Sequence, residues 1–154
     1  MNVLFVCLGN ICRSPIAEGL LKKKFEESKT TGRVESAGFE SFHINDSPDP
    51  RAVKVCAHHG IDISGKRARL FRVSDFDAFD KIYVMDFKNM QDVMEVARNE
   101  TDKKKVDYLL NLIEPGSNKS VADPYYSGFD ACEDTFRQME RACQVITDQI
   151  KQKA

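Results

Sequence analysis

The sequence lacks any long apolar run, and this absence limits where the protein is expected to act. A membrane-spanning helix needs about 20 consecutive apolar residues, and no stretch of the 154 residues approaches that length. The apolar run at residues 3–6 is too short for the core of a secretion signal and has no basic region before it. We therefore expect a cytoplasmic protein without a membrane partner.

Paired cysteines are also missing. The five cysteines are odd in number and include no Cys-x-x-Cys pair, which argues against a disulfide framework and against a zinc site. His58 and His59 are neighbours, and neighbouring side chains on a helix point in different directions, so they cannot easily share a metal. The formal net charge of −1 supplies no global field for nucleic acid. We expect neither a metal nor a nucleic-acid partner.

The 154 residues, 42% hydrophobic and 31% charged, suit one soluble domain spanning residues 1–154. Apolar runs predict strands, and helical periodicity predicts the segments between them. The predicted strands are residues 2–6, 33–37, 81–85 and 106–110, and the predicted helices are 15–27, 50–59, 87–98 and 129–151, with a helical turn at 74–77. This alternation implies an α/β fold with parallel strands.

The carboxyl ends of parallel strands share one edge of a sheet, where ligands bind. That rule places Cys7, Gly38 and Asp86 together at one edge. The loop that begins at Cys7 therefore lies where a small α/β domain keeps its active site.

Residues 6–15 are the most informative stretch. They join a buried strand to a helix, for which we predict Ser14 as the N-cap and Pro15 as the first residue. Unpaired N–H groups at a helix N-terminus attract anions and favour a thiolate, and the Arg13 guanidinium matches two phosphate oxygens. Cys7 is thus the candidate nucleophile for attack on phosphorus, although an inert buried cysteine is the commoner fate of this residue type.

The remaining loop residues have more than one interpretation. Gly9 and Asn10 suit positive φ, which would turn successive N–H groups inward around an anion, or they form an ordinary turn. The Ser14 hydroxyl either caps its helix or points at the Cys7 sulfur. Cys12 either fills space or forms a reversible disulfide with Cys7, which would make the nucleophile redox-sensitive.

Asp123 is the candidate general acid. It stands in a loop with Pro124, Tyr125 and Tyr126, which carries more aromatic surface than a loop needs. Asp-Pro also opens ordinary turns. Beside a cysteine nucleophile, however, a carboxyl group here could protonate the oxygen that leaves from an aryl phosphate ester.

With these residues in place, the chain closely resembles the low-molecular-weight protein tyrosine phosphatases along essentially its whole length. The resemblance rests on residues 6–15, 34–38, 48–52, 59–61, 85–86 and 123–126. It implies a single doubly wound α/β domain with a four-stranded parallel sheet and helices on both faces. It also implies a cysteine-dependent hydrolase that acts on phosphotyrosine and small aryl phosphates without a cofactor.

The resemblance implies roles for individual residues. Cys7 would form a phosphocysteine, Arg13 would hold the phosphate, and Asp123 would supply and then remove a proton. The phosphate-binding loop would contribute the N–H groups of residues 8–14, which include Leu8, Gly9, Asn10, Ile11, Cys12 and Ser14. Leu8, Phe42 and Tyr125 would be apolar walls around the substrate ring, with Tyr126 nearby, and Asn10, Ser14 and Ser36 would hold the loop in shape.

The chain departs from the family pattern at two places. Lys66 stands where the family often shows a histidine that supports the loop, and residues 39–45 differ from common versions of the specificity loop, with Phe42 retained and His43 given no role. The expected partner is a tyrosine-phosphorylated protein or peptide, the expected product is inorganic phosphate, and the expected state is a monomer.

Two other functions remain for comparison. A thiol-dependent arsenate reductase on the same fold would need a further cysteine pair between Gly60 and Asn99, and none is present. A non-catalytic phosphate-binding or redox-sensing module would use Cys7 and Cys12 but would not need Asp123.

Overall fold

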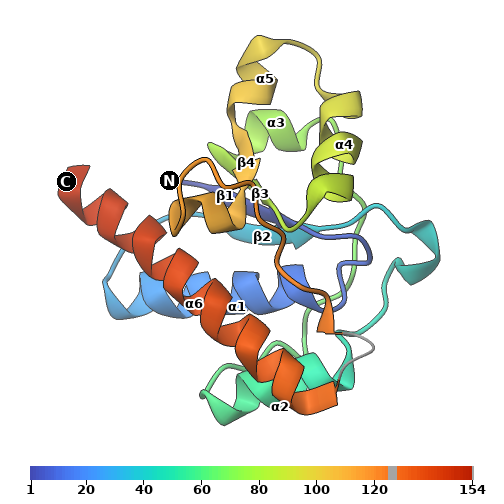
Figure 1. Ribbon diagram of the computed structural model, residues 1–154, viewed down its shortest axis with the longest axis vertical. Coiled ribbons are helices and arrows are strands. Elements are labelled where there is room, and N and C mark those ends of the chain that lie inside the picture. The colour runs from blue at the N-terminus through green and yellow to red at the C-terminus, as the bar shows by residue number, and fades with distance from the viewer. Residues whose placement is uncertain (125–127, 154) are drawn as a thin grey trace.

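A four-stranded parallel sheet forms the centre of the computed structural model, which describes residues 1–124 and 128–153 (Figure 1). The strands are β1 (Val3–Val6), β2 (Val34–Ala37), β3 (Lys81–Val84) and β4 (Val106–Tyr108). Their order is β2-β1-β3-β4, and every neighbouring pair is parallel. The predicted α/β fold with four parallel strands is confirmed.

Helices cover both faces of this sheet, which confirms the doubly wound arrangement (Figure 1). One face carries α1 (Arg13–Glu27), α2 (Pro50–His58) and the long α6 (Gly128–Lys153). The other face carries α3 (Asp75–Ala78), α4 (Phe87–Val96) and α5 (Glu100–Lys104). No helix in the described ranges is both long and apolar enough to cross a membrane.

The central strand β1 shows why the sheet is buried on both sides. All four of its side chains are fully buried. Val3 and Phe5 pack in the core beneath α1, α2 and α6, whereas Leu4 and Val6 pack in the core on the opposite face. An unbroken apolar run is what a parallel strand covered on both faces requires.

Several boundaries differ from the prediction. Ser14 is not the N-cap of α1, as predicted, because the chain enters the helix earlier, with Cys12 at the N-cap and Arg13 as the first helical residue. Pro15 is accordingly the third helical residue rather than the first. The fourth strand ends at Tyr108, and a 3-10 helix, η2 (Leu109–Leu112), takes up the apolar residues that follow.

Besides η2, two other short helices were not predicted. One is α5, in which Asn99 is the N-cap and its side chain accepts a hydrogen bond from the Asp102 N–H. The other is the 3-10 helix η1 (Ser41–His43), inside residues 39–45, which correspond to the specificity loop of the family that the sequence resembles. Both are shorter than two α-helical turns, so hydrophobic periodicity has too few residues to reveal them.

Candidate active site

The candidate site lies at the carboxyl edge of the sheet. Val6 at the end of β1 is in register with Ala37 of β2 and Val84 of β3. Cys7, Gly38 and Asp86 follow these strand ends and therefore lie at one edge, as predicted from the order of the elements.

Cys7 lies where β1 gives way to the loop before α1. Its side chain is buried, and its Sγ atom is 2.9 Å from the Ser14 hydroxyl oxygen. The 15-residue helix α1 begins six residues later. A hydroxyl donor and the positive end of a helix dipole both stabilise negative charge on a sulfur atom. Of the two interpretations of Ser14, the structure thus supports contact with the cysteine sulfur.

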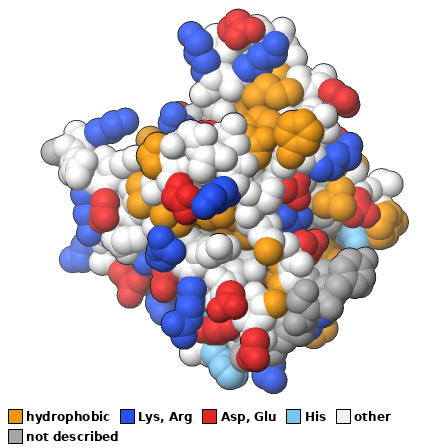
Figure 2. Space-filling view, in the orientation of Figure 1, with side chains coloured by type: hydrophobic (Ala, Val, Ile, Leu, Met, Phe, Trp, Pro, Cys, Tyr) orange, Lys and Arg blue, Asp and Glu red, His pale blue; other side chains and the backbone are white. Residues whose placement is uncertain are grey.

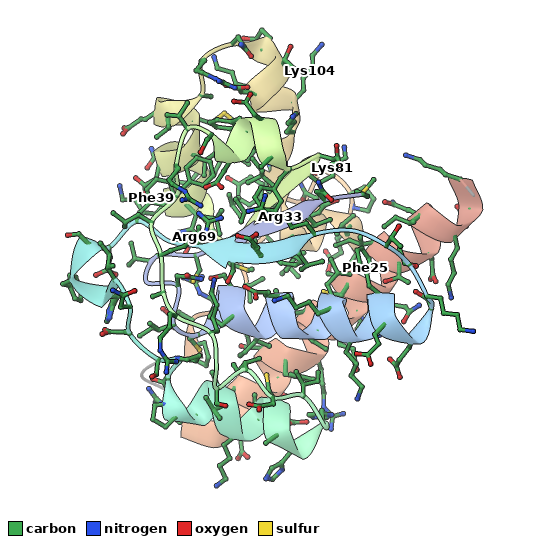
Figure 3. All side chains as sticks on the ribbon, turned by 180° about the vertical axis from the view of Figure 1, so that it is seen from behind. Phe25, Arg33, Phe39, Arg69, Lys81 and Lys104 are labelled. Atoms are coloured by element: carbon green, nitrogen blue, oxygen red, sulfur yellow. The ribbon has the colours of Figure 1, made fainter. Side chains whose placement is uncertain are left out.

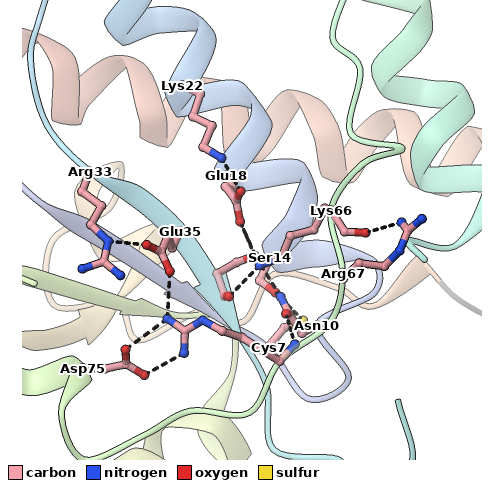
Figure 4. Close-up of polar contacts among 12 residues, drawn as sticks. Cys7, Asn10, Ser14, Glu18, Lys22, Arg33, Glu35, Lys66, Arg67 and Asp75 are labelled. Atoms are coloured by element: carbon pink, nitrogen blue, oxygen red, sulfur yellow. Dashed lines mark hydrogen bonds and ion pairs between the residues drawn. The ribbon is translucent and has the colours of Figure 1, made fainter. Parts of the chain in front are cut away.

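A buried hydrogen-bonded chain runs from Cys7 to the middle of α1 (Figure 4). The Asn10 amide donates to the hydroxyls of Ser14 and Ser36, at 2.8 and 2.9 Å. The Ser36 hydroxyl in turn donates to Glu18 Oε1 at 2.6 Å. An ionised carboxylate only accepts hydrogen bonds, so Glu18 fixes the direction of the chain. The Ser14 hydrogen is thereby left to donate to the Cys7 sulfur.

Lys66 closes the far end of this chain. Its Nζ donates to the Ser36 carbonyl at 3.0 Å and lies 3.3 Å from Glu18 Oε1, while Lys22 Nζ donates to Glu18 Oε2 at 2.6 Å. Burial lowers the pKa of Lys66, against the opposing effect of the Glu18 carboxylate. Lysine at this position therefore contacts the loop support directly. Glu18 was missed in the sequence, where only its position four residues after Ser14, on the same helix face, indicates it.

Asn10 is the loop residue with unusual backbone geometry. Its φ is +56°, and its Oδ1 accepts a hydrogen bond from the Arg69 backbone N–H at 3.0 Å. The Arg69 side chain, labelled in Figure 3, is itself held by Asp75 and Glu35. The segment that supports Asn10 is thus anchored to β2 and α3.

The prediction of positive φ is wrong for Gly9. Its φ is outside the left-handed region, unlike that of Asn10. Glycine is suited to this position for another reason, because a Cβ atom here would lie 3.1 Å from Cδ2 of His43. The missing side chain lets the histidine ring pack against the loop.

Arg13 connects three parts of the site. Its buried guanidinium donates from Nη1 to Asp86 Oδ2 and to the Val121 carbonyl, both at 2.9 Å. Its Nη2 is 3.7 Å from Asp123 Oδ2. Burial acts to lower the pKa of Arg13, but the neighbouring Cys7 and Asp86 outweigh it and raise the pKa. The charge is therefore retained in a buried position.

Asp123 lies at the mouth of the site, with 45% of its side chain exposed. The chain leading to it is fixed by Val121, whose N–H donates to the Met85 carbonyl at 2.7 Å. A carboxyl group near a buried guanidinium and open to solvent can exchange protons with a bound group and with water.

These residues surround one pocket of about 290 Å³. Its lining comprises Cys7, Leu8, Gly9, Ile11, Cys12, Arg13, Glu40, Phe42, His43 and Asp123. Asn10 and Ser14 are buried and support the loop rather than line the pocket. Tyr125 and Tyr126 lie outside the described residues. Glu40 was not predicted to lie here, and His43 had no predicted role.

No group of three or more His, Cys, Asp or Glu side chains that could hold a metal ion occurs within residues 1–124 and 128–153. The chemistry available in the pocket is that of a thiol, a guanidinium, a carboxyl group and the backbone of a loop. Together these suit nucleophilic attack on an oxyanion.

Comparisons with known proteins identify this chain as similar to phosphatases. A family model described as low molecular weight phosphotyrosine protein phosphatase matches residues 2–154. A Sus scrofa protein of that description is 34% identical over 152 residues, covering 97% of this chain and 96% of its own. A protein tyrosine phosphatase structure from Entamoeba histolytica has a TM-score of 0.91 at 31% identity, covering 99% and 97% of the two chains.

A further similar structure is described as the YwlE arginine phosphatase, in which a cysteine-to-serine mutant carries a phosphorylated active-site serine. Its TM-score is 0.88 at 26% identity, and the match covers 98% of this chain and 96% of that one. YwlE is described elsewhere as a protein of Bacillus subtilis.

Proposed function

This chain belongs to the low molecular weight phosphotyrosine protein phosphatase family, and from that premise we propose that it hydrolyses phosphotyrosine and small aryl phosphate monoesters through a phosphocysteine. The enzyme is a protein tyrosine phosphatase, hence a hydrolase acting on a phosphoprotein. The observation that carries the mechanism is the convergence of three side chains on one pocket: Cys7 and Arg13 from the loop and first turn of α1, and Asp123 from a distant segment.

In the first step the Cys7 thiolate attacks phosphorus, and the bond from phosphorus to the phenolic oxygen breaks. Asp123, protonated at this stage, donates its proton to the departing oxygen, so the leaving group is a neutral phenol. Arg13 and the N–H groups of residues 8–14 hold the three equatorial oxygens as charge spreads over them. The Ser14 hydroxyl, 2.9 Å from the sulfur, supports the thiolate before attack.

In the second step a water molecule attacks phosphorus and the bond from phosphorus to sulfur breaks. The Asp123 carboxylate takes a proton from that water, inorganic phosphate leaves, and the Cys7 thiolate is regenerated. The phosphorylated serine in the arginine phosphatase mutant supports a covalent phosphoenzyme on this fold.

The apolar rim of the pocket supports an aromatic substrate. Leu8 is 37% exposed and Phe42 is 72% exposed, and both line the pocket above the loop. We assign them to the two sides of the phosphorylated ring, with Gly9, Ile11 and Cys12 forming the surface beneath it. Tyr125 keeps its expected place in the wall as a prediction only.

The same site supports a reversible redox state. Burial, together with the negative charge of neighbouring groups such as Cys7, raises the pKa of Cys12, so Cys12 stays a thiol while Cys7 reacts. Peroxide would oxidise the Cys7 thiolate to a sulfenic acid, and the Cys12 thiol would then form a disulfide with release of water. We include this switch, a cytoplasmic location and a monomeric state over residues 1–154 in the proposal.

The proposed function is tested by assaying p-nitrophenyl phosphate and a phosphotyrosine peptide in the presence of a chelator. Wild type should hydrolyse both, and Cys7→Ser should lower kcat by at least about a thousandfold, because the nucleophile is lost. Undiminished turnover in that variant would refute the mechanism. A phosphoarginine peptide is assayed in parallel. If it were hydrolysed faster than the phosphotyrosine peptide, this chain would share the substrate class of the arginine phosphatase.

The role of Asp123 is tested with aryl phosphates whose leaving groups differ in basicity. Asp123→Ala should lower kcat by about a hundredfold or more for the most basic leaving group, since general acid catalysis contributes about 10²–10⁴. The loss should shrink as the leaving group becomes more acidic. An equal loss for all esters would remove Asp123 from this role.

A further inference from the structure

Among the described residues, one segment supplies all of the pocket wall that is not the phosphate-binding loop or Asp123. Glu40, Phe42 and His43 lie within four residues of one another, at and beside η1. Figure 2 shows hydrophobic, acidic and histidine side chains together at the edge of the molecule where Figure 1 places this segment. Since the phosphate occupies the loop, this wall faces the residues of a substrate on either side of the phosphotyrosine.

The wall is held at both of its ends, so its side chains have defined positions. At the start, the N–H groups of Phe39 and Glu40 both donate to the Leu8 carbonyl, at 2.8 and 3.2 Å. At the end, the Asn45 N–H donates to the Ala68 carbonyl at 2.8 Å, and the Ala68 N–H donates back to the Asp46 carbonyl at 3.0 Å.

His43 is oriented by two contacts. Its Nδ1 is 2.9 Å from Asp46 Oδ2, and its opposite edge, with Cδ2 and Nε2, packs against the loop at Gly9. A carboxylate only accepts hydrogen bonds, so Nδ1 carries the proton. The ring held in this way lines the pocket together with Glu40 and Phe42.

The chemistry of the wall is therefore one-sided. It offers the Glu40 carboxylate and the ring of Phe42, whose centroid is 4.2 Å from that of His43. The Asp46 carboxylate, which contacts His43 Nδ1, adds negative charge beside these groups. Among the described residues that line the pocket, Arg13 alone carries a permanent positive charge, and it lies at the floor. The nearby Arg67 guanidinium donates to the carbonyls of Ser64 and Lys66.

Acceptor atoms next to an exposed aromatic ring are suited to a side chain that has only donors. Arginine and lysine fit this description, because both present N–H groups without acceptors and both bind aromatic faces. We propose that Glu40, Phe42, His43 and Asp46 form a subsite that selects phosphotyrosine flanked by a basic residue. The inference rests on the proposed phosphatase function and adds its substrate preference.

The test compares phosphotyrosine peptides that are identical except for arginine, glutamine or glutamate on both sides of the phosphotyrosine. At low salt kcat/KM should fall in that order, with about a tenfold ratio between the arginine and glutamate peptides, as expected for a few exposed charge pairs and a cation–π contact. The ratio should fall toward about twofold at high salt because exposed charges are screened. Equal rates at low salt, or a preference for glutamate, would overturn the subsite.

Variants locate the preference. In Glu40→Gln/Asp46→Asn the ratio between the arginine and glutamate peptides should drop to about twofold, and Phe42→Leu should lower it part of the way. The matched control is Glu27→Gln, which removes one exposed carboxylate far from the pocket on α1 and should keep the wild-type ratio. An unchanged ratio in the double variant would contradict the assignment.

Failure of the proposed function and failure of the subsite are separable. Wild type that hydrolysed neither the peptides nor p-nitrophenyl phosphate would overturn the phosphatase proposal. Dissociation constants of the same peptides for Cys7→Ser, measured by calorimetry, decide the subsite without turnover. Tighter binding of the arginine peptide by about tenfold would support it, and equal binding would refute it.

Discussion

Replacing Glu18 with glutamine would test the buried chain that ends at Cys7. The side chain of Glu18 is 8% exposed and accepts from Ser36 and Lys22, with Lys66 at 3.3 Å. Glutamine has the same shape but no charge, and it turns one acceptor into a donor. In the arrangement that loses the fewest contacts, the glutamine oxygen still accepts the hydrogen bond from the Ser36 hydroxyl. The new NH₂ group then faces Lys22, and the exposed Lys22 side chain moves into solvent.

The magnitude follows from what remains around Lys66. Breaking a buried ion pair costs about 3–5 kcal/mol when the remaining charge has no other partner. Lys66 keeps its hydrogen bond to the Ser36 carbonyl at 3.0 Å. We therefore expect the loss in unfolding free energy to lie near the lower end of that range, at about 3 kcal/mol. For a domain of this size that loss lowers Tm by about 6–12 °C.

The loss should also depend on pH. Burial already lowers the pKa of Lys66 in the folded state below its ordinary value of 10.5. At pH values between the folded and the unfolded pKa of Lys66, the unfolded chain binds more protons than the folded protein. The free energy of unfolding therefore rises with pH in this interval. Losing the carboxylate lowers the folded pKa further and widens that interval. The free energy of unfolding that Glu18→Gln loses relative to wild type should therefore be largest near neutral pH and shrink as pH approaches 10.

The assay is a double-mutant cycle by chemical denaturation, using Glu18→Gln, Lys66→Met and the double variant. Methionine keeps the length of the side chain but has no charge to leave unpaired, so the double variant should recover about 1–3 kcal/mol relative to additivity. Glu27→Gln, on the exposed side of α1, is the control. If the losses in unfolding free energy of the two single variants added up to that of the double variant, Glu18 and Lys66 would not be coupled. A loss in Glu18→Gln that did not change with pH would show the same.

Three further predictions use other parts of the structure. Gly38→Ala should destabilise the fold by at least about 2 kcal/mol, because its Cβ would lie 2.8 Å from a backbone oxygen of the phosphate-binding loop; wild-type stability in denaturant titration would contradict this. Burial raises the pKa of Asp49, but the bonds from Arg51 outweigh it and lower that pKa, so Asp49→Asn should cost about 1 kcal/mol at pH 7 and almost nothing below the lowered pKa. A loss as large in acid as at neutral pH would mean that the charge is unimportant. After mild peroxide treatment, mass spectrometry should show a disulfide between Cys7 and Cys12, and over-oxidised Cys7 without that bond would refute the switch.

The layout of the fold could be predicted from the sequence because its strands are buried on both faces. The β1 residues form an unbroken apolar run, and the rule for parallel strands then places Cys7 and Asp86 at one edge. The helix start could not be placed correctly, since Ser14 has the residue type of an N-cap but uses its hydroxyl at the Cys7 sulfur. Local propensity gives no sign of such a tertiary contact.

The site residues divide in the same way. Cys7 and Arg13 are close in sequence and could be identified from the buried strand before them and the helix start that follows. Glu40 and His43 are brought to the site by packing between distant segments, and nothing local distinguishes them from ordinary surface residues. Glu18 has only its spacing from Ser14 on the same helix to indicate it. The backbone of Gly9 was predicted incorrectly because glycine serves there to admit the His43 ring, not to adopt positive φ.

The contact between Arg13 and Val121 affects how variants of Arg13 should be interpreted. The same guanidinium that faces the anion site also holds the carbonyl two residues before Asp123. A lysine at position 13 would keep the charge but has no planar fork to hold Asp86, Val121 and a phosphate at once. Such a variant would lose the proposed general acid and the proposed oxyanion ligand together. A kinetic defect at Arg13 therefore measures the alignment of two chain segments as well as the affinity for phosphate.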